Sequence, residues 1–229
     1  MYFSKFAMTN RDAMRLLQQG KVLGSESEGW RNIAEHCLLA GVMAYKLGQL
    51  VNLSQQDLEE VTNAALTHDW DKRLEKEAAK RSAEKTEGGQ IVVNYDPKIV
   101  AKQEENKKGL ARVTGADWND IETWGTKEKI LRYIDSCLGT TKDGRAEFQP
   151  WRDRLADLAK RHPVINKEQG ERMYGMPLYD KLAEVTARVE KDLFEEVKKN
   201  NLRDSNTGSP ADLSMLTELS LAADIAHNT

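Results

Sequence analysis

The chain has 229 residues, a net charge of −3 and 31% charged residues. This length suits one domain with a sizeable core, and the mildly acidic balance argues against nucleic acid or an anionic membrane as a partner. The longest apolar run, Leu38 to Tyr45, is far shorter than the roughly 20 residues of a membrane-spanning helix. Two cysteines cannot form a disulfide framework, so we expect a cytoplasmic protein with reduced thiols.

Two amphipathic helices are predicted before residue 51. The first covers about residues 9–20, where Thr9 or Asn10 can cap and where the apolar stripe is formed by Ala13, Leu16 and Leu17. The second runs from about Arg31 to Leu50. Along it, successive steps of four, three and four residues place on one inward stripe His36, Ala40, Met43 and Leu47.

A third helix is predicted to begin at Ser54, with Asp57 three residues on in the manner of a capping box. Its apolar stripe consists of Leu58, Val61 and Ala65, and it leads directly into His68-Asp69. An adjacent histidine and aspartate at the end of a buried stripe are candidates for metal ligands.

The middle of the chain is less regular. Residues 74–90 are rich in Lys and Glu, which predicts a solvated helix end and a loop, although a lid over a site is an alternative. Residues 91–100 predict either a short strand or an ordered loop. An amphipathic helix is expected over 98–113, ended by Thr114-Gly115.

The last predicted helices follow residue 125. Thr126 can cap a helix that Gly139 ends, and its buried face is formed by Ile130, Leu131, Ile134 and Leu138, with Asp135 at the border of that face. Further helices are predicted at 151–161, 179–200 and 209–227. The predicted fold class is therefore all-α, with at most a minor hairpin.

Three of these helices bring ligand-type side chains to an apolar stripe: His36, His68 with Asp69, and Asp135. A buried charge is strongly unfavourable unless it is paired or bound to a metal. Two imidazoles and two carboxylates suit a divalent ion such as Mn, Fe, Co, Ni or Zn. We therefore expect one divalent cation, with Mg as a further option, and free coordination positions for water and a substrate oxygen.

The pattern of His36, then His68-Asp69, then Asp135 resembles the signature of the HD-domain metal-dependent phosphohydrolases. The segment Asn32-Ile33-Ala34-Glu35-His36 resembles the Asn-x-x-Glu-His of their 5′-deoxynucleotidase branch. The resemblance covers about residues 30 to 138. It implies an HD-domain helical core at 1–160, with a C-terminal helical extension at 161–229 packed on it and consistent with a homodimer.

The resemblance also implies a reaction: hydrolysis of a nucleotide phosphomonoester by metal-activated water, with Asp69 in the catalytic set. Lys72 follows His68 by four residues, so it is a candidate to hold a substrate phosphate, and Arg73 is a second one. Asp71 could serve as general acid or base. Asn32 and Glu35 are candidates for the substrate rim. The nucleotidase branch more often has an acidic residue where Lys72 stands.

Other interpretations of the same residues remain open. Taken singly, His36 is a core histidine and His68-Asp69 a surface pair, and Trp118, Trp124, Trp151, Cys37 and Cys137 suit core packing. Dinuclear HD enzymes need further histidines, and none lies between His68 and His162. The rival function is a non-catalytic HD-fold module that binds a nucleotide or a protein. Replacing Asp69 by Ala would abolish turnover in an enzyme and would leave the binding of such a module intact.

Overall fold

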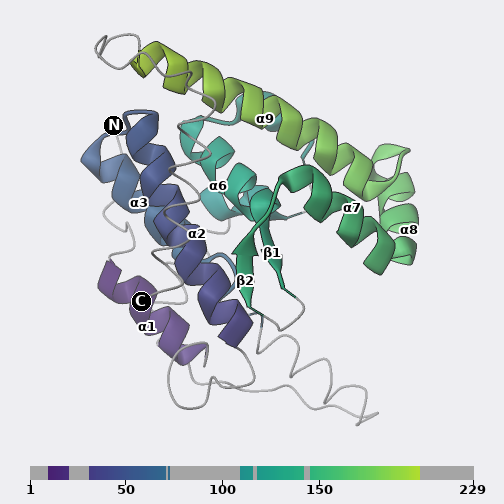
Figure 1. Cartoon of the computed structure of the whole chain (residues 1–229), viewed down its shortest axis with the longest axis horizontal. Helices are drawn as coiled ribbons and strands as arrows, with labels where there is room; N and C mark the ends of the chain where they lie inside the picture. The colour runs from purple at the N-terminus through teal and green to yellow at the C-terminus, as the bar shows by residue number, and fades with distance from the viewer. Residues whose placement is uncertain are drawn as a thin grey trace.

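The computed structural model describes residues 10–20, 31–70, 72, 109–115, 118–141 and 145–201. Within these residues the chain is helical apart from a two-stranded antiparallel sheet, which confirms the all-α class with a minor hairpin (Figure 1). The predictions for 74–100, most of the helix expected at 98–113 and the helix at 209–227 lie outside the described residues. None of the described helices combines the length and the hydropathy needed to cross a bilayer.

The first three helices are found where the sequence predicts them: α1 (Asn10–Gln19), α2 (Arg31–Leu50) and α3 (Gln55–Thr67). Ser54 caps α3 by accepting a hydrogen bond from the Asp57 amide at 3.2 Å. Helices α2 and α3 lie side by side (Figure 1). A Cβ at Gly41 would lie 2.5 Å from a methyl carbon of Leu66, and one at Gly48 would lie 2.5 Å from Leu58. The close approach of the two helices therefore requires both glycines.

Helix α6 (Thr126–Cys137) leads directly into strand β1 (Leu138–Thr140), which pairs with β2 (Ala146–Phe148). Two predictions about its ends are wrong. Gly125, not Thr126, is the N-cap residue, because the Thr126 hydroxyl donates to Glu196 of α9 at 3.0 Å. Gly139 does not end the helix: it lies in β1 opposite Glu147, where a side chain would collide with Gln149.

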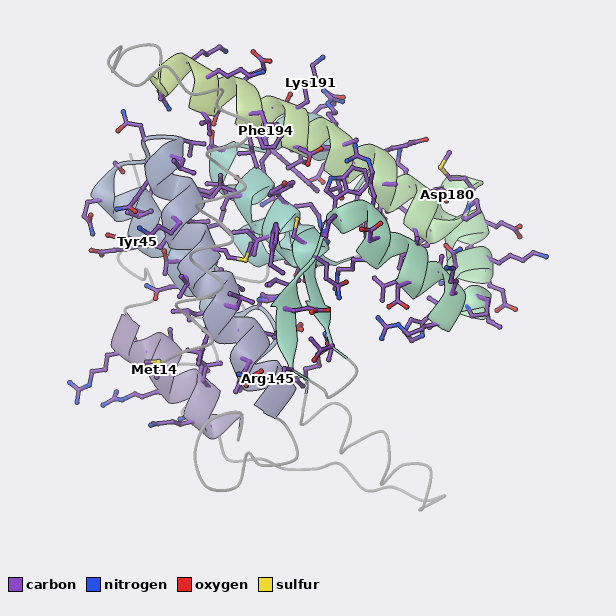
Figure 2. The ribbon with its side chains drawn as sticks, in the orientation of Figure 1. Met14, Tyr45, Arg145, Asp180, Lys191 and Phe194 are labelled. Atoms are coloured by element: carbon purple, nitrogen blue, oxygen red, sulfur yellow. The ribbon has the colours of Figure 1, made fainter. Side chains whose placement is uncertain are left out.

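The C-terminal described helices are α7 (Trp151–Arg161), α8 (Pro163–Tyr174) and α9 (Leu178–Asn201). Helix α9 lies across α6 and α7 (Figure 1). Phe194 of α9 (Figure 2) meets Tyr133 of α6 edge-on, with 6.4 Å between the ring centroids. Helix α8 was not predicted, since it has no apolar stripe and buries only Gly170. Its sequence signals are Pro163 in the first turn and Gly175, which ends it with a φ of 67°.

One large apolar cluster contains buried residues of α2, α3, α6, α7 and α9. A smaller cluster joins α1 to the start of α2 and to Trp70. The core assignment is confirmed for Trp118, Trp124, Trp151, Cys37 and Cys137, all of which are buried. Two short 3-10 helices, η2 (Leu110–Thr114) and η3 (Ile121–Thr123), precede α6, and the division of the chain at residue 160 stays a prediction.

Candidate metal centre

The packing of α2, α3 and α6 brings the predicted ligands to one place. His36 lies in the second turn of α2, and His68 is the residue that ends α3, with Asp69 in the turn that follows. Asp135 lies in the last turn of α6. Because each ligand borders the buried stripe of its own helix, packing of the stripes brings the polar ends together.

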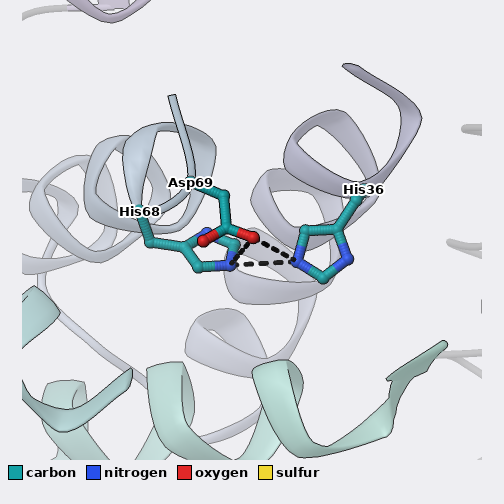
Figure 3. Close-up of side chains that lie close together, drawn as sticks. All are labelled: His36, His68 and Asp69. Carbon is teal, nitrogen blue, oxygen red and sulfur yellow. Dashed lines mark hydrogen bonds and ion pairs between the residues drawn. The ribbon is translucent and has the colours of Figure 1, made fainter. Parts of the chain in front are cut away.

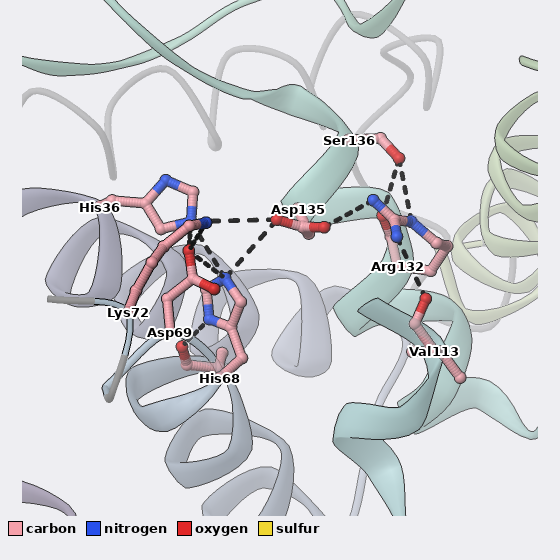
Figure 4. A network of polar contacts seen from close by, with 9 residues as sticks. His36, His68, Asp69, Lys72, Val113, Arg132, Asp135 and Ser136 are labelled. Carbon is pink, nitrogen blue, oxygen red and sulfur yellow. Dashed lines mark hydrogen bonds and ion pairs between the residues drawn. The ribbon is translucent and has the colours of Figure 1, made fainter. Parts of the chain in front are cut away.

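The four side chains converge closely. Donor atoms of His36, His68 and Asp69 lie within 4.8 Å of one another (Figure 3). The two imidazole Nε2 atoms are 3.0 Å apart. Asp135 Oδ1 lies 3.5 Å from His68 Nε2 and 3.9 Å from His36 Nε2 (Figure 4). Asp69 Oδ2 lies 3.8 Å from His36 Nε2 and 4.0 Å from His68 Nε2.

These distances fit the coordination shell of one divalent ion. Ligand bonds of about 2.1 Å place neighbouring donor atoms about 3.0–3.4 Å apart and opposite donors about 4.2 Å apart. The five measured separations run from 3.0 to 4.0 Å: one equals the value for neighbouring donors, and four lie between the values for neighbouring and opposite donors. The donor set, two imidazole nitrogens and two carboxylate oxygens, is also suited to such an ion. The residues present therefore fit a single divalent metal.

The orientation of His68 is set by its own helix. Its Nδ1 lies 2.7 Å from the carbonyl oxygen of Ala65 and donates its proton there. This contact directs the other ring nitrogen, Nε2, at the centre, as is usual for metal-binding histidines. This partner could not be predicted from the side chains of the sequence, because it is a backbone group.

Asp135 is oriented by a buried arginine three residues before it. Arg132 is 3% exposed and donates to Asp135 Oδ2 at 2.6 Å, to the Val113 carbonyl at 3.1 Å and to Ser136 Oγ at 3.2 Å (Figure 4). One carboxylate oxygen of Asp135 is thus held by Arg132, and the other lies toward the imidazoles. The sequence analysis missed Arg132, although its spacing of three from Asp135 on a helix was a usable signal.

The pKa values of three of these groups reflect the crowding. Burial and the neighbouring His68 lower the pKa of His36 to about 3. Burial lowers the pKa of His68 as well, but the charges of Asp69 and Asp135 outweigh it and raise the value. Burial raises the pKa of Asp135, yet Arg132 and His68 hold it well below its ordinary value. The negative potential that favours a proton on His68 also favours a divalent cation.

Lys72 and Glu35 lie beside this centre in different ways. Lys72 Nζ donates to Asp69 Oδ2 at 2.5 Å, so the lysine is paired with a ligand carboxylate (Figure 4). Glu35 accepts from the Ala146 amide at 3.2 Å and lies 3.4 Å from Arg145 Nε, so it joins α2 to β2. Asp71 and Arg73 lie outside the described residues, as does the side chain of Asn32, and their roles stay predictions.

Comparisons with known proteins give no identification: no family model, no curated protein and no solved structure matches the chain. The function must therefore be argued from the centre itself.

Proposed function

We propose that the chain is a metal-dependent phosphohydrolase of the HD type that hydrolyses a nucleotide phosphomonoester. The observation that carries the proposal is the convergence of His36, His68, Asp69 and Asp135 from three helices, with separations of 3.0 to 4.0 Å between the measured pairs of donor atoms. A divalent ion held there would lower the pKa of water and neutralise charge on phosphoryl oxygens.

The protein side chains have separate tasks in this proposal. The two imidazoles supply nitrogen donors: the low pKa of His36 favours its uncharged form, and the Ala65 contact of His68 directs Nε2 at the centre. Arg132 fixes the carboxylate of Asp135, so that little reorganisation is needed when charge develops on the substrate. Because this preorganisation is built into the core, the centre is ready before substrate binds.

Lys72 is the candidate for the substrate phosphate. Its ammonium is already at the edge of the centre, 2.5 Å from Asp69, and its side chain is 45% exposed. A phosphate could therefore replace Asp69 as the partner of this ammonium without entering the core. Asp71, which follows Trp70, remains the proposed proton-transfer group.

The test uses the purified full chain. Metal analysis is expected to find one divalent ion per chain, and a screen of nucleoside monophosphates with Mn²⁺ or Co²⁺ is expected to release inorganic phosphate. Asp69→Ala should abolish both. Asp57→Asn is the matched control, because Asp57 lies on the surface of α3, the helix that precedes Asp69, and pairs with Lys127.

Absence of any bound transition metal, together with absence of phosphate release, would overturn the proposal. Metal binding without phosphate release from any nucleotide would contradict the reaction and would leave only the metal centre.

A further inference from the structure

Arg154 of α7 occupies an unusual position for a charged side chain. It is only partly exposed, and it falls on the stripe by which α7 faces the core, with Trp151, Leu155 and Leu158. Trp151 and Leu155 are both at most 5% exposed. The spacing of three to four residues along a helix places Arg154 on that inward face.

The guanidinium of Arg154 has no protein partner within the described part of the chain. Its Nε is buried and makes no hydrogen bond, and no described carboxylate forms an ion pair with it. The neighbouring arginines on α7 differ: Arg152 lies 3.7 Å from Glu190 and over the Trp151 ring, and Arg161 pairs with Asp157 at 2.6 Å. Buried charged groups are normally paired, so Arg154 lacks an expected anion.

Arg154 lies on α7, which packs on α6, the helix that carries Asp135. Burial lowers the pKa of Arg154, and the charge of Asp135 opposes that shift. In turn the positive charge of Arg154 contributes to the low pKa of Asp135. The two groups are thus within electrostatic reach, although Asp135 is hydrogen-bonded to Arg132 and not to Arg154.

We propose that Arg154 is the cationic group of an anion subsite beside the metal centre, and that this subsite takes a phosphate group, from the ester or as released product. A guanidinium offers several N–H donors in one plane and matches phosphate oxygens well. The choice of phosphate over other oxyanions rests on the proposed function. The observation that no described residue pairs with this guanidinium does not depend on the proposed function.

The test measures binding of inorganic phosphate to the full chain by calorimetry, with and without Mn²⁺. We expect Arg154→Gln to weaken phosphate binding about tenfold or more, the loss typical of a hydrogen bond to a charged group. Arg154→Lys should keep part of the affinity. Arg152→Gln is the matched control on the exposed side of the same helix and should bind phosphate as the wild type does.

Folding provides a second readout. Because no described carboxylate compensates the charge of Arg154, Arg154→Gln should unfold at the same or a higher temperature in phosphate-free buffer, and phosphate should raise that temperature only in the wild type. If phosphate binds the wild type and Arg154→Gln equally, or binds neither, the subsite is wrong.

Kinetics separates ester from product and separates this proposal from the proposed function. A rise in KM for the nucleotide in Arg154→Gln indicates that the ester phosphate uses the subsite, and weaker product inhibition alone indicates the released phosphate. Arg154-dependent phosphate binding without hydrolysis of any ester would leave the subsite standing and contradict the phosphohydrolase. If the protein hydrolyses an ester and Arg154→Gln leaves KM, product inhibition and phosphate affinity unchanged, the phosphohydrolase stands and the subsite is wrong.

Discussion

Helix α6 carries two polar clusters that use the same kinds of side chain for different ends. Asp135 faces the imidazoles of α2 and α3, whereas Tyr133, about 200° away around the helix, faces α9. There the Tyr133 hydroxyl and the Trp151 indole N–H both donate to Glu190 Oε1, at 3.1 and 3.0 Å. Donors and acceptors are matched in this second cluster.

The cluster around Asp135 is not matched. Asp69 Oδ2 accepts from Lys72, but three further potential acceptors meet there, His36 Nε2, His68 Nε2 and Asp135 Oδ1, and one shared proton can satisfy only one contact between them. A surplus of acceptors that meet at one point calls for a cation, whereas a matched cluster only stabilises the fold. An excess of acceptors over donors is therefore a better guide to a functional site than the mere presence of polar groups in a core.

The largest expected effect follows from breaking the unmatched cluster. Asp135→Asn removes one ligand charge, so Mn²⁺ affinity measured by calorimetry should fall more than about 100-fold, beyond the 10–100-fold typical of outer-shell changes. The free energy of unfolding should also fall by about 1–3 kcal/mol, because buried Arg132 loses its charged acceptor. Asp157→Asn, on the surface of α7, is the control. Wild-type Mn²⁺ affinity in Asp135→Asn would exclude Asp135 as a ligand.

Breaking the matched cluster should lower the stability of the fold without changing the affinity for the metal. Glu190→Leu leaves the buried donors of Tyr133 and Trp151 unpaired, so urea denaturation should show a loss of about 2–4 kcal/mol in the free energy of unfolding. Mn²⁺ affinity should stay unchanged. Glu184→Leu removes an exposed pair with Lys181 and should change stability by less than about 1 kcal/mol. A parallel loss of Mn²⁺ affinity in Glu190→Leu would mean that the clusters are not independent.

Replacing Arg132 tests whether metal binding depends on the orientation of Asp135 as well as on its presence. Arg132→Lys keeps the charge, but one ammonium cannot match the guanidinium contacts to Asp135, Val113 and Ser136, so we expect about tenfold weaker Mn²⁺ binding. Ser136→Ala is the matched control: it removes a contact of Arg132 and leaves that to Asp135. It should cost about 1 kcal/mol of stability and no metal affinity. Equal Mn²⁺ affinity in Arg132→Lys and wild type would assign Arg132 a purely structural role.

Much of the fold and the ligand set could be predicted from local patterns. The stripe through His36, Ala40 and Met43 fixes which face of α2 is buried, and the same rule places His68 at the end of α3. Where periodicity was absent, prediction failed: α8 has no stripe and was missed. The Thr126 cap was wrong because a contact from distant α9 took its hydroxyl, which local sequence cannot show.

The two arginines near the site were harder to predict from the sequence, for a similar reason. Arg132 and Arg154 are charged residues on inward faces, and surface exposure is the usual expectation for arginine. Only tertiary packing shows that Arg132 contacts Asp135, Val113 and Ser136 and that Arg154 has no partner among the residues the structure describes. The position of a charge relative to a stripe was visible in the sequence, but its partners were not.

The smallest expected effect concerns Lys72, which supplies the cation that touches Asp69 Oδ2. An incoming metal must compete with this ammonium for Asp69 Oδ2, so Lys72→Met should raise Mn²⁺ affinity by about two- to fivefold, the worth of a partly exposed ion pair. If Lys72 also holds the substrate phosphate, the same variant should raise KM for the nucleotide. Lys191→Met, at an exposed position of α9 (Figure 2), is the control and should change neither. An unchanged KM with a raised metal affinity would leave Lys72 as a competitor of the metal alone, whereas a lowered metal affinity would show that its charge supports the centre.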